Sequence, residues 1–296
     1  MVNDKIQTSM FSRVISGSLK GVDGYRVTVE VDVARGLPAL NIVGLPDQSV
    51  KESKNRVVAA LRNSGYNFPA KKITINLAPA DIKKEGPLFD LPSAVGILQA
   101  QGRIKKDKLK EYCIVGELAL DGSVRPIKGV LSIALEMKRL KLKGIILPDG
   151  NKTESGIVGG LETIPVKNIN EAAGFLNGEL EVEPFKPGDD VFESALGVIY
   201  DISDVKGQSF AKRAVEVACA GAHNIIMVGP PGTGKTMLAK RIPYILPDMS
   251  FEEALETTKI HSAYGLVNRD NGFILNRPFR SPHHTASDIV LEQWAV

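Results

Sequence analysis

Apolar and polar residues alternate in two early stretches of the chain, residues 25–33 and residues 72–77. A period of two places every second side chain on the same face of a strand, so both stretches are predicted to be strands with one face against a core. A shorter apolar segment, residues 39–43, is predicted to be a further strand.

The period changes to that of a helix in residues 47–63. Val50, Val57 and Leu61 fall on one helical face, Asp47 can accept from the free amides at the start, and Gly65 can supply a left-handed stop. The same reasoning predicts the other elements of the first half: helices at 91–101 behind Asp90, at 131–142 and at 172–176; strands at 144–147 and 163–166; and a hairpin of residues 112–120 and 123–127 joined by Asp121-Gly122. This mixture predicts a layered α/β or α+β architecture.

Residues 179–190 combine acidic side chains with two prolines and a glycine, a composition typical of a linker. We therefore predict a first domain at residues 1–178, a linker at 179–195 and a second domain at 196–296. In the second domain a helix is predicted at 210–220, an apolar strand at 224–228 and a helix at 236–245. This order is that of a nucleotide-binding α/β core.

Composition limits the class of protein. The chain has 296 residues, enough for about two domains, and its 43% hydrophobic and 24% charged residues exclude a disordered or collagen-like chain. A formal charge of +3 is too small to imply binding to nucleic acid or membranes by itself. Two local basic runs, residues 103–110 and 138–143, could contact phosphates, although such runs are more often solvated helix faces.

Cellular location is indicated by the cysteines and by the absence of long apolar runs. Cys113 and Cys219 lie far apart among apolar neighbours, which is typical of reduced thiols rather than of a disulfide framework. No run approaches the ~18 apolar residues of a membrane helix, and no signal-peptide core follows the first residues. We expect a cytoplasmic protein without a membrane partner.

One motif carries clear chemistry. Residues 229–236 fit the phosphate-binding pattern of Gly, four residues, Gly-Lys-Thr, and they lie between the predicted strand and helix. Loop amides can converge on phosphate oxygens there, Lys235 would reach the β and γ phosphates, and the Thr236 hydroxyl would hold Mg²⁺. The expected cofactors are ATP and Mg²⁺. The expected ligands are Gly229, Pro230, Pro231, Gly232, Thr233, Gly234, Lys235 and Thr236, and the alternative is a Gly/Pro turn that merely joins strand to helix.

Several stretches spread over the chain, together with this loop, resemble the magnesium-chelatase-like AAA+ ATPases and, within them, the ComM/YifB family. They are residues 41–47, 76–81, 84–86, 89–92, 204–208, 211–214 and 277–284. The resemblance implies an N-terminal domain with a Lon-protease-like, ribosomal-S5-like fold followed by an AAA+ module. It also implies a hexameric, ATP-driven motor on branched or single-stranded DNA, acting in recombination during DNA uptake.

Hydrolysis of ATP also requires acidic residues that position Mg²⁺ and the attacking water. Downstream of Thr236 no strand of four apolar residues ends in Asp-Glu, and the nearest candidate is Glu292 in residues 289–292. The family pattern continues past Val296 with its acidic strand, sensor, trans-acting arginine and lid, and whether this end is natural, frameshifted or engineered stays open. We assign no catalytic residue and expect binding with little hydrolysis. The alternative is a non-enzymatic interaction module carried by the N-terminal domain.

Two further groups of residues invite a chemical role. Ser93 resembles the nucleophile of Lon proteases, but Leu131 stands where the lysine base would fall, so we expect no proteolysis and a Ser93 that satisfies a helix start. His283 and His284 are adjacent on a predicted extended segment and lack acidic or cysteine partners at ligand spacing, which disfavours a metal site. Arg277 and Arg280 are expected to face DNA or a neighbouring subunit, as the resemblance implies.

Overall fold

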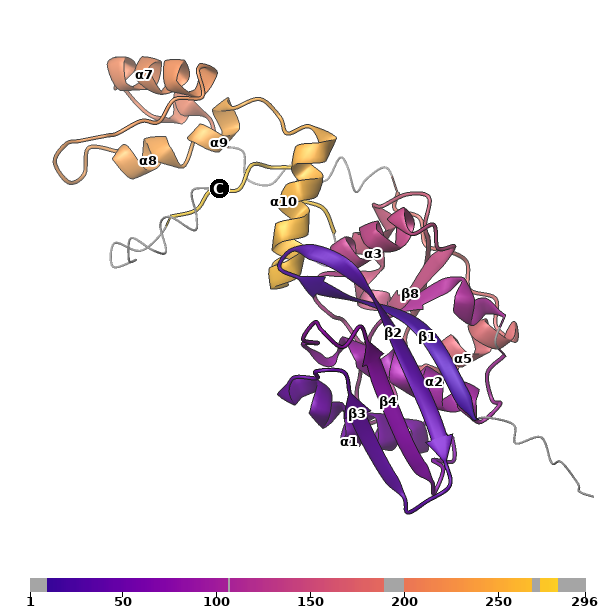
Figure 1. Ribbon diagram of the computed structural model, residues 1–296. Coiled ribbons are helices and arrows are strands. Elements are labelled where there is room, and N and C mark those ends of the chain that lie inside the picture. The colour runs from indigo at the N-terminus through magenta and orange to yellow at the C-terminus, as the bar shows by residue number, and fades with distance from the viewer. Residues whose placement is uncertain (1–9, 106, 189–199, 268–271, 282–296) are drawn as a thin grey trace, which may run out of the picture. The chain divides into compact units, whose positions relative to one another are not determined.

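A computed structural model describes residues 10–105, 107–188, 200–267 and 272–281 (Figure 1). The chain divides into two compact units, one of Met1–Val191 with Leu255–Phe273 and one of Phe192–Ala254 with Ile274–Val296. Each unit is described by itself below. Among the described residues no helix is both long enough and apolar enough to span a lipid bilayer.

A seven-stranded mixed sheet forms the centre of the first unit, in the order β3-β4-β2-β1-β5-β8-β9. Antiparallel pairs join β1 to β2 and β2 to β4, and the other neighbours run parallel. The strands are β1 (Phe11–Lys20), β2 (Asp23–Ala34), β3 (Ala39–Val43), β4 (Lys72–Ala78), β5 (Tyr112–Ile114), β8 (Gly144–Pro148) and β9 (Glu162–Val166). The predicted α/β fold class is confirmed.

Strand β1 lies in the middle of this sheet, yet the sequence pattern did not predict it. Its residues Ser12, Ser16 and Ser18 are buried, so polar and apolar letters do not alternate with the pleat. The Ser12 hydroxyl donates to the carbonyl of Gly96 at 2.7 Å, which satisfies one of these groups inside the core. Buried serines therefore conceal a central strand from a test of periodicity.

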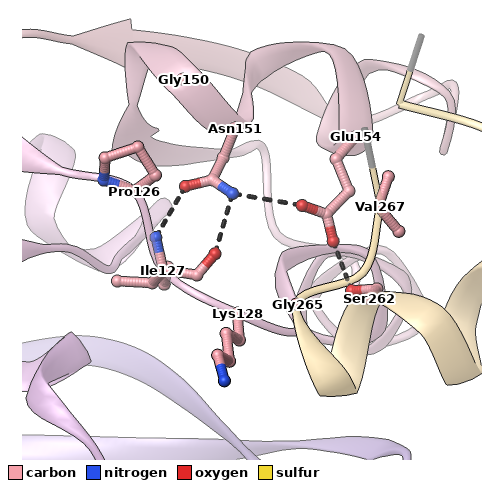
Figure 2. A pocket seen from close by; sticks show the side chains of 9 residues that line it. All are labelled: Pro126, Ile127, Lys128, Gly150, Asn151, Glu154, Ser262, Gly265 and Val267. Carbon is pink, nitrogen blue, oxygen red and sulfur yellow. Dashed lines mark hydrogen bonds between the residues drawn. The ribbon is translucent and has the colours of Figure 1, made fainter. Parts of the chain in front are cut away.

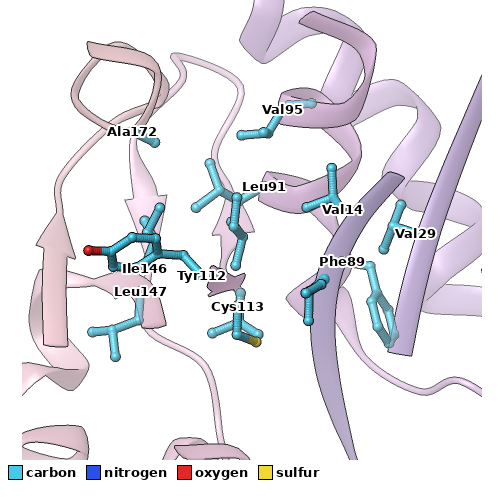
Figure 3. Packing of buried hydrophobic residues seen from close by; sticks show 14 of the residues in the cluster. Val14, Val29, Phe89, Leu91, Val95, Tyr112, Cys113, Ile146, Leu147 and Ala172 are labelled. Atoms are coloured by element: carbon cyan, nitrogen blue, oxygen red, sulfur yellow. The ribbon is translucent and has the colours of Figure 1, made fainter. Parts of the chain in front are cut away.

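Helices α1 (Gln48–Asn63), α2 (Asp90–Ala100), α3 (Val130–Arg139), α4 (Lys152–Gly156) and α5 (Ile169–Asn177) accompany the sheet. The predicted ends of α1 are confirmed: the Asp47 carboxylate accepts from the Val50 amide at 2.7 Å, and Gly65 has φ +87°. Every residue of α2 is buried. Figure 3 shows its Leu91 and Val95 among side chains of the sheet, including Val14 and Cys113.

The hairpin predicted for residues 112–127 exists only in its outer part. Residues 112–114 form β5 of the main sheet, and β6 (Glu117–Leu118) pairs with β7 (Val124–Arg125) as a separate ribbon. Gly116 separates the two with φ +158°, and a Cβ there would lie 2.8 Å from the Val124 side chain. The glycine thus lets the chain leave the sheet and enter the turn.

The beginning of the predicted linker lies against the first unit. The amide of Phe185 donates to the carbonyl of Thr163 at 2.8 Å, so this residue extends the edge of the sheet beyond β9. Linker composition therefore does not prevent residues 180–188 from making ordered contacts, because one aromatic residue and one backbone bond attach them.

The second unit contains α7 (Ser209–Ala220), α8 (Lys235–Ala239), α9 (Ile242–Ile245) and the start of α10 (Phe251–Tyr264). The strand predicted at residues 224–228 is wrong: Ile226 is 87% and Val228 88% exposed, and no described strand pairs with them. The amides and carbonyls of a strand need a neighbouring strand as hydrogen-bond partner. The apolar run in the sequence does not reveal whether such a neighbour exists. The helix predicted at 236–245 is divided at Lys240 and Arg241, because Pro243 cannot donate to the preceding turn.

Candidate functional site

The predicted phosphate-binding loop is an open turn between residue 228 and α8. Gly232 has φ +79° and Gly234 φ +84°, conformations that favour glycine. No atom lies within 4 Å of the position that a Cβ would take at either residue. The backbone conformation therefore requires these glycines, and this side of the loop is free for a ligand to approach the main chain.

Lys235 begins α8 and folds back over the loop. Its ammonium donates to the carbonyls of Gly229 and Pro230, both at 2.8 Å, and lies 3.4 Å from the Thr233 hydroxyl. That hydroxyl donates to the Pro230 carbonyl at 2.9 Å. The positive charge is thus held at the loop by neutral acceptors, and an anionic phosphate oxygen is a stronger acceptor for the same ammonium.

Residues before α7 lie beside the loop and belong to the same unit. The Gln208 side-chain amide is 3.5 Å from the Thr233 carbonyl. Arg241, which follows α8, bonds the Asp201 carbonyl at 2.9 Å and the Asp204 carboxylate at 3.1 Å. Two separate parts of the sequence, residues 201–208 and 229–241, are therefore brought together around the motif.

The loop residues fit the phosphates of a nucleotide. Glycines at positive φ leave the backbone accessible, Lys235 supplies a cation, and Thr236 is exposed with a hydroxyl suited to Mg²⁺. Helix α8 is only five residues long, so its dipole is smaller than the predicted ten-residue helix would give. Most of the attraction for phosphate would come from loop amides and Lys235.

The Lon-like pair of positions lies inside the core of the first unit. Ser93 is the fourth residue of α2 and 2% exposed, and α2 has no side-chain bond at its start, so the expectation that Ser93 satisfies the helix terminus is wrong. Leu131 is fully buried, and its amide donates to the Glu154 carboxylate at 3.0 Å. The apolar Leu131, which the Lon resemblance matches to the lysine base, is thus packed in the core.

Asp90, expected as a helix cap, is instead part of a buried ion pair that sequence reasoning missed. Its carboxylate accepts from Arg56 of α1 at 2.6 and 3.2 Å and from the Leu118 amide at 3.2 Å. Burial raises the pKa of Asp90 to about 6, against the lowering effect of Arg56. The only signal in the sequence was one carboxylate inside the apolar run of residues 88–98.

A cavity of about 170 Å³ in the first unit is lined by polar groups (Figure 2). Asn151 bonds both the amide and the carbonyl of Ile127 at 2.9 Å and donates to Glu154 at 3.1 Å. Glu154 also accepts from the Ser262 hydroxyl, and burial raises the pKa of this carboxyl. Figure 2 shows the Lys128 side chain directed away from Asn151 and Glu154. Through its bonds to the Leu131 amide and to Ser262, Glu154 links the start of α3 to α10.

The remaining candidates lie at the C-terminal side. Arg277 forms an ion pair with Glu253 at 3.2 Å and bonds the Pro247 carbonyl at 2.9 Å, so part of its donor capacity is used within the second unit. His283, His284 and Glu292 lie outside the described residues. Within the described residues no group of three or more His, Cys, Asp or Glu side chains could hold a metal ion.

Comparison with known proteins agrees with the resemblance in both halves of the chain. A family model described as subunit ChlI of Mg-chelatase matches residues 29–151, and one described as magnesium chelatase, subunit ChlI, matches residues 201–292. The uncharacterized protein YifB of Escherichia coli is 47% identical over 269 residues, 90% of this chain and 52% of that protein. Competence protein ComM of Haemophilus influenzae is 42% identical over 280 residues, 93% of this chain and 54% of that protein.

The chain belongs to the ComM/YifB family. It spans about half the length of these two relatives. Lon protease 2 of Bacillus subtilis is 28% identical over 187 residues, 57% of this chain and 32% of that protein, so similarity to Lon accompanies the family match. In this ComM/YifB chain the second family match includes the whole of the phosphate-binding loop.

Proposed function

We propose that this ComM/YifB-family chain binds ATP with Mg²⁺ at residues 229–236, as the nucleotide-binding part of a magnesium-chelatase-like AAA+ protein. The observation that supports this most is the position of the Lys235 ammonium, 2.8 Å from two carbonyls of its own loop. A lysine held at this place is available to the β and γ phosphates of a nucleotide.

Each part of the loop has a distinct task in this proposal. The amides of residues 232–236 surround the phosphates, Lys235 neutralises their charge, and the Thr236 hydroxyl holds Mg²⁺. Bound Mg²⁺ would neutralise charge on the phosphate oxygens. Gln208 contacts the Thr233 carbonyl and thereby connects the loop to the segment before α7.

Hydrolysis demands more than this loop supplies. A carboxylate must orient the attacking water, and an arginine must stabilise the charge of the transferred phosphoryl group, a contribution of ~10³ to 10⁵ in rate in related systems. The sequence identifies neither residue. We therefore infer that the chain binds nucleotide and hardly hydrolyses it.

The wider role is inferred from the family. One relative is named a competence protein, and the family resemblance implies recombination and branch migration on DNA during uptake, with hexameric assembly. For this chain we infer DNA and further copies of the chain as partners. Cys113 and Cys219 are free thiols, which is consistent with a reducing cytoplasm.

The alternative of a non-enzymatic interaction module is not favoured by the comparisons. The family match at residues 201–292 includes the loop and is separate from the match in the N-terminal unit. If the function lay only in the first unit, the complete phosphate-binding motif at residues 229–236 would have no explanation.

Limited proteolysis of the full chain tests the proposal, because a ligand that binds the folded state protects it from cleavage. Mg-ADP is expected to slow cleavage within residues 200–254. Lys235→Ala should abolish this protection, whereas Lys240→Ala, which removes an exposed lysine outside the loop, should retain it. Equal digestion of all three proteins with and without Mg-ADP would contradict the proposal.

A further inference from the structure

The two basic runs of the sequence meet at one edge of the first unit, where the neighbouring strands β5 and β8 begin. The Lys143 amide donates to the Glu111 carbonyl at 3.0 Å, and Tyr112 of β5 pairs with Gly144 of β8. Residues 108–111 and 141–143 therefore precede two neighbouring parallel strands, side by side. Strands that lie about 4.8 Å apart bring the side chains of these runs within reach of one ligand.

The end of α5 attaches a third segment to the same edge. The Asn177 side chain accepts from the Lys105 amide at 3.0 Å and donates to the Arg103 carbonyl at 3.1 Å. Lys108 donates to the Phe175 carbonyl at 2.8 Å. We call this surface the basic edge; its cationic side chains are Arg103, Lys105, Lys108, Lys110, Lys138, Arg139, Lys141 and Lys143.

Positive charge exceeds negative charge on the basic edge. Eight described cationic side chains and five carboxylates belong to these segments and their neighbours, an excess of three positive charges. These carboxylates are Asp107, Glu111, Glu136, Glu162 and Glu179.

Not every cation of the basic edge is already used. Arg139 bonds Glu136 at 2.6 and 2.8 Å, and Lys143 lies 3.9 Å from Glu162. Arg103, Lys110 and Lys141 are exposed, and no ion pair of theirs is found among the described residues. These three side chains can meet an external anion without losing an internal partner.

Lys141 lies in an unusual backbone conformation. It follows the end of α3 with φ +59°, in the left-handed region that favours glycine, and its amide donates to the Lys138 carbonyl. Glycine would fit this backbone better than lysine does. The lysine places its charge on an exposed turn directly after α3.

We propose that the basic edge binds the phosphate backbone of single-stranded nucleic acid without sequence preference. This proposal rests on the proposed function and names the surface through which the chain meets DNA. Exposed ammonium and guanidinium groups on short turns suit a flexible polyanion. The aromatic rings at the edge, Tyr112 and Phe175, are 2% and 6% exposed, so bases cannot stack on them and the contacts are limited to phosphates.

Fluorescence anisotropy of the full chain with a labelled oligo-dT strand, measured over a range of salt concentrations, tests the assignment. The triple variant Arg103→Gln, Lys110→Gln, Lys141→Gly is expected to bind at least ~10-fold more weakly at low salt. Its slope of log affinity against log salt should fall by about 2, since each lost phosphate contact contributes ~0.7 on a single strand. A control triple with the same charge change on the opposite half of the sheet, Arg35→Gln, Lys51→Gln, Lys72→Gln, should bind like the original chain.

Lys141→Gly alone separates binding from folding. The proposal expects weaker DNA binding together with an unchanged or higher melting temperature, because glycine relieves the backbone. Unchanged affinity of the first triple, or equal losses in both triples, would overturn the proposal. The first triple could also retain its affinity for oligo-dT and lose affinity for phosphatidylglycerol vesicles. That result would overturn the proposal as well, because the basic edge would then bind a membrane surface and not DNA.

The same proteins distinguish this proposal from the nucleotide proposal. Without nucleotide, Lys235→Ala should leave oligo-dT binding at the basic edge unchanged, and the first triple should bind Mg-ADP normally. Loss of Mg-ADP binding alone in Lys235→Ala leaves the basic edge supported, and loss of oligo-dT binding alone in the triple leaves the nucleotide site supported.

Discussion

Removing Arg56 should expose the electrostatic cost of the buried Asp90 carboxylate. The Asp90 side chain is 0% exposed, and Arg56, itself 21% exposed, bonds it through two nitrogens. In Arg56→Met the apolar stem stays and the charge is lost. Breaking one partner of a buried pair typically costs 3–5 kcal/mol, so we expect the free energy of unfolding at pH 7 to fall by about 4 kcal/mol.

The pH dependence of this loss follows from the pKa of Asp90, which burial raises to about 6. A carboxyl whose folded pKa exceeds the unfolded value of ~3.9 binds more protons when folded, so stability falls as pH rises, by about 1.4 kcal/mol per unit up to the folded pKa. The original chain should level off above pH 6. Arg56→Met, with a still higher pKa for Asp90, should continue to lose stability, and the difference should grow by up to about 2.7 kcal/mol between pH 6 and 8.

Urea denaturation followed by circular dichroism at pH 5, 6, 7 and 8 measures these values. Arg56→Met with Asp90→Asn should recover most of the loss at pH 8, because no buried charge remains. Arg13→Met, which breaks the exposed pair with Glu30, should cost less than about 1 kcal/mol at every pH. A cost for Arg56→Met that is the same at pH 5 and pH 8, or no recovery in the double variant, would refute the reasoning.

Three other outcomes can be checked. Gly44→Ala should lower the free energy of unfolding by more than ~3 kcal/mol, because φ is +98° and the new Cβ would lie 2.2 Å from the Leu77 carbonyl oxygen. Gly65→Ala, at φ +87° with no atom near the new Cβ, should cost only about 1 kcal/mol. Equal costs for the two variants in chemical denaturation would contradict this prediction. The full chain should not digest unfolded casein, and cleavage that Ser93→Ala abolishes would disprove the inactive assignment. Phosphate release from ATP should stay at background with or without single-stranded DNA, and DNA-stimulated release that requires Lys235 would reveal an overlooked catalytic acid.

Much of the fold could be predicted where side chains follow a single period. Helix α1 and strands β2 and β4 each have one apolar face, so both the elements and the cap at Asp47 were predictable. Strand β1 was not, because it buries serines, among them Ser12, whose hydroxyl donates to the distant Gly96 carbonyl. At residues 224–228 the error was the opposite one, because a strand was predicted that the structure does not form. An apolar composition does not show whether a second strand is there to pair with it.

The candidate site divides in a similar way. The phosphate-binding loop could be predicted because its function is local: glycines, lysine and threonine act through backbone conformation within eight residues. The Arg56–Asp90 pair and the convergence of the basic runs depend on contacts between segments more than 30 residues apart. Nothing in the sequence of one segment specifies its partner, so these features became visible only in the fold.

Titration of a fluorescent ADP analogue in the presence of Mg²⁺ tests the central assignment most directly. The original chain and Lys240→Ala should bind the analogue with the same affinity, because Lys240 lies outside the loop. Lys235→Ala should bind at least ~10-fold more weakly, corresponding to the loss of about 1.4 kcal/mol or more of phosphate interaction. Equal affinity of Lys235→Ala and the original chain would contradict the assignment of residues 229–236 as a phosphate site.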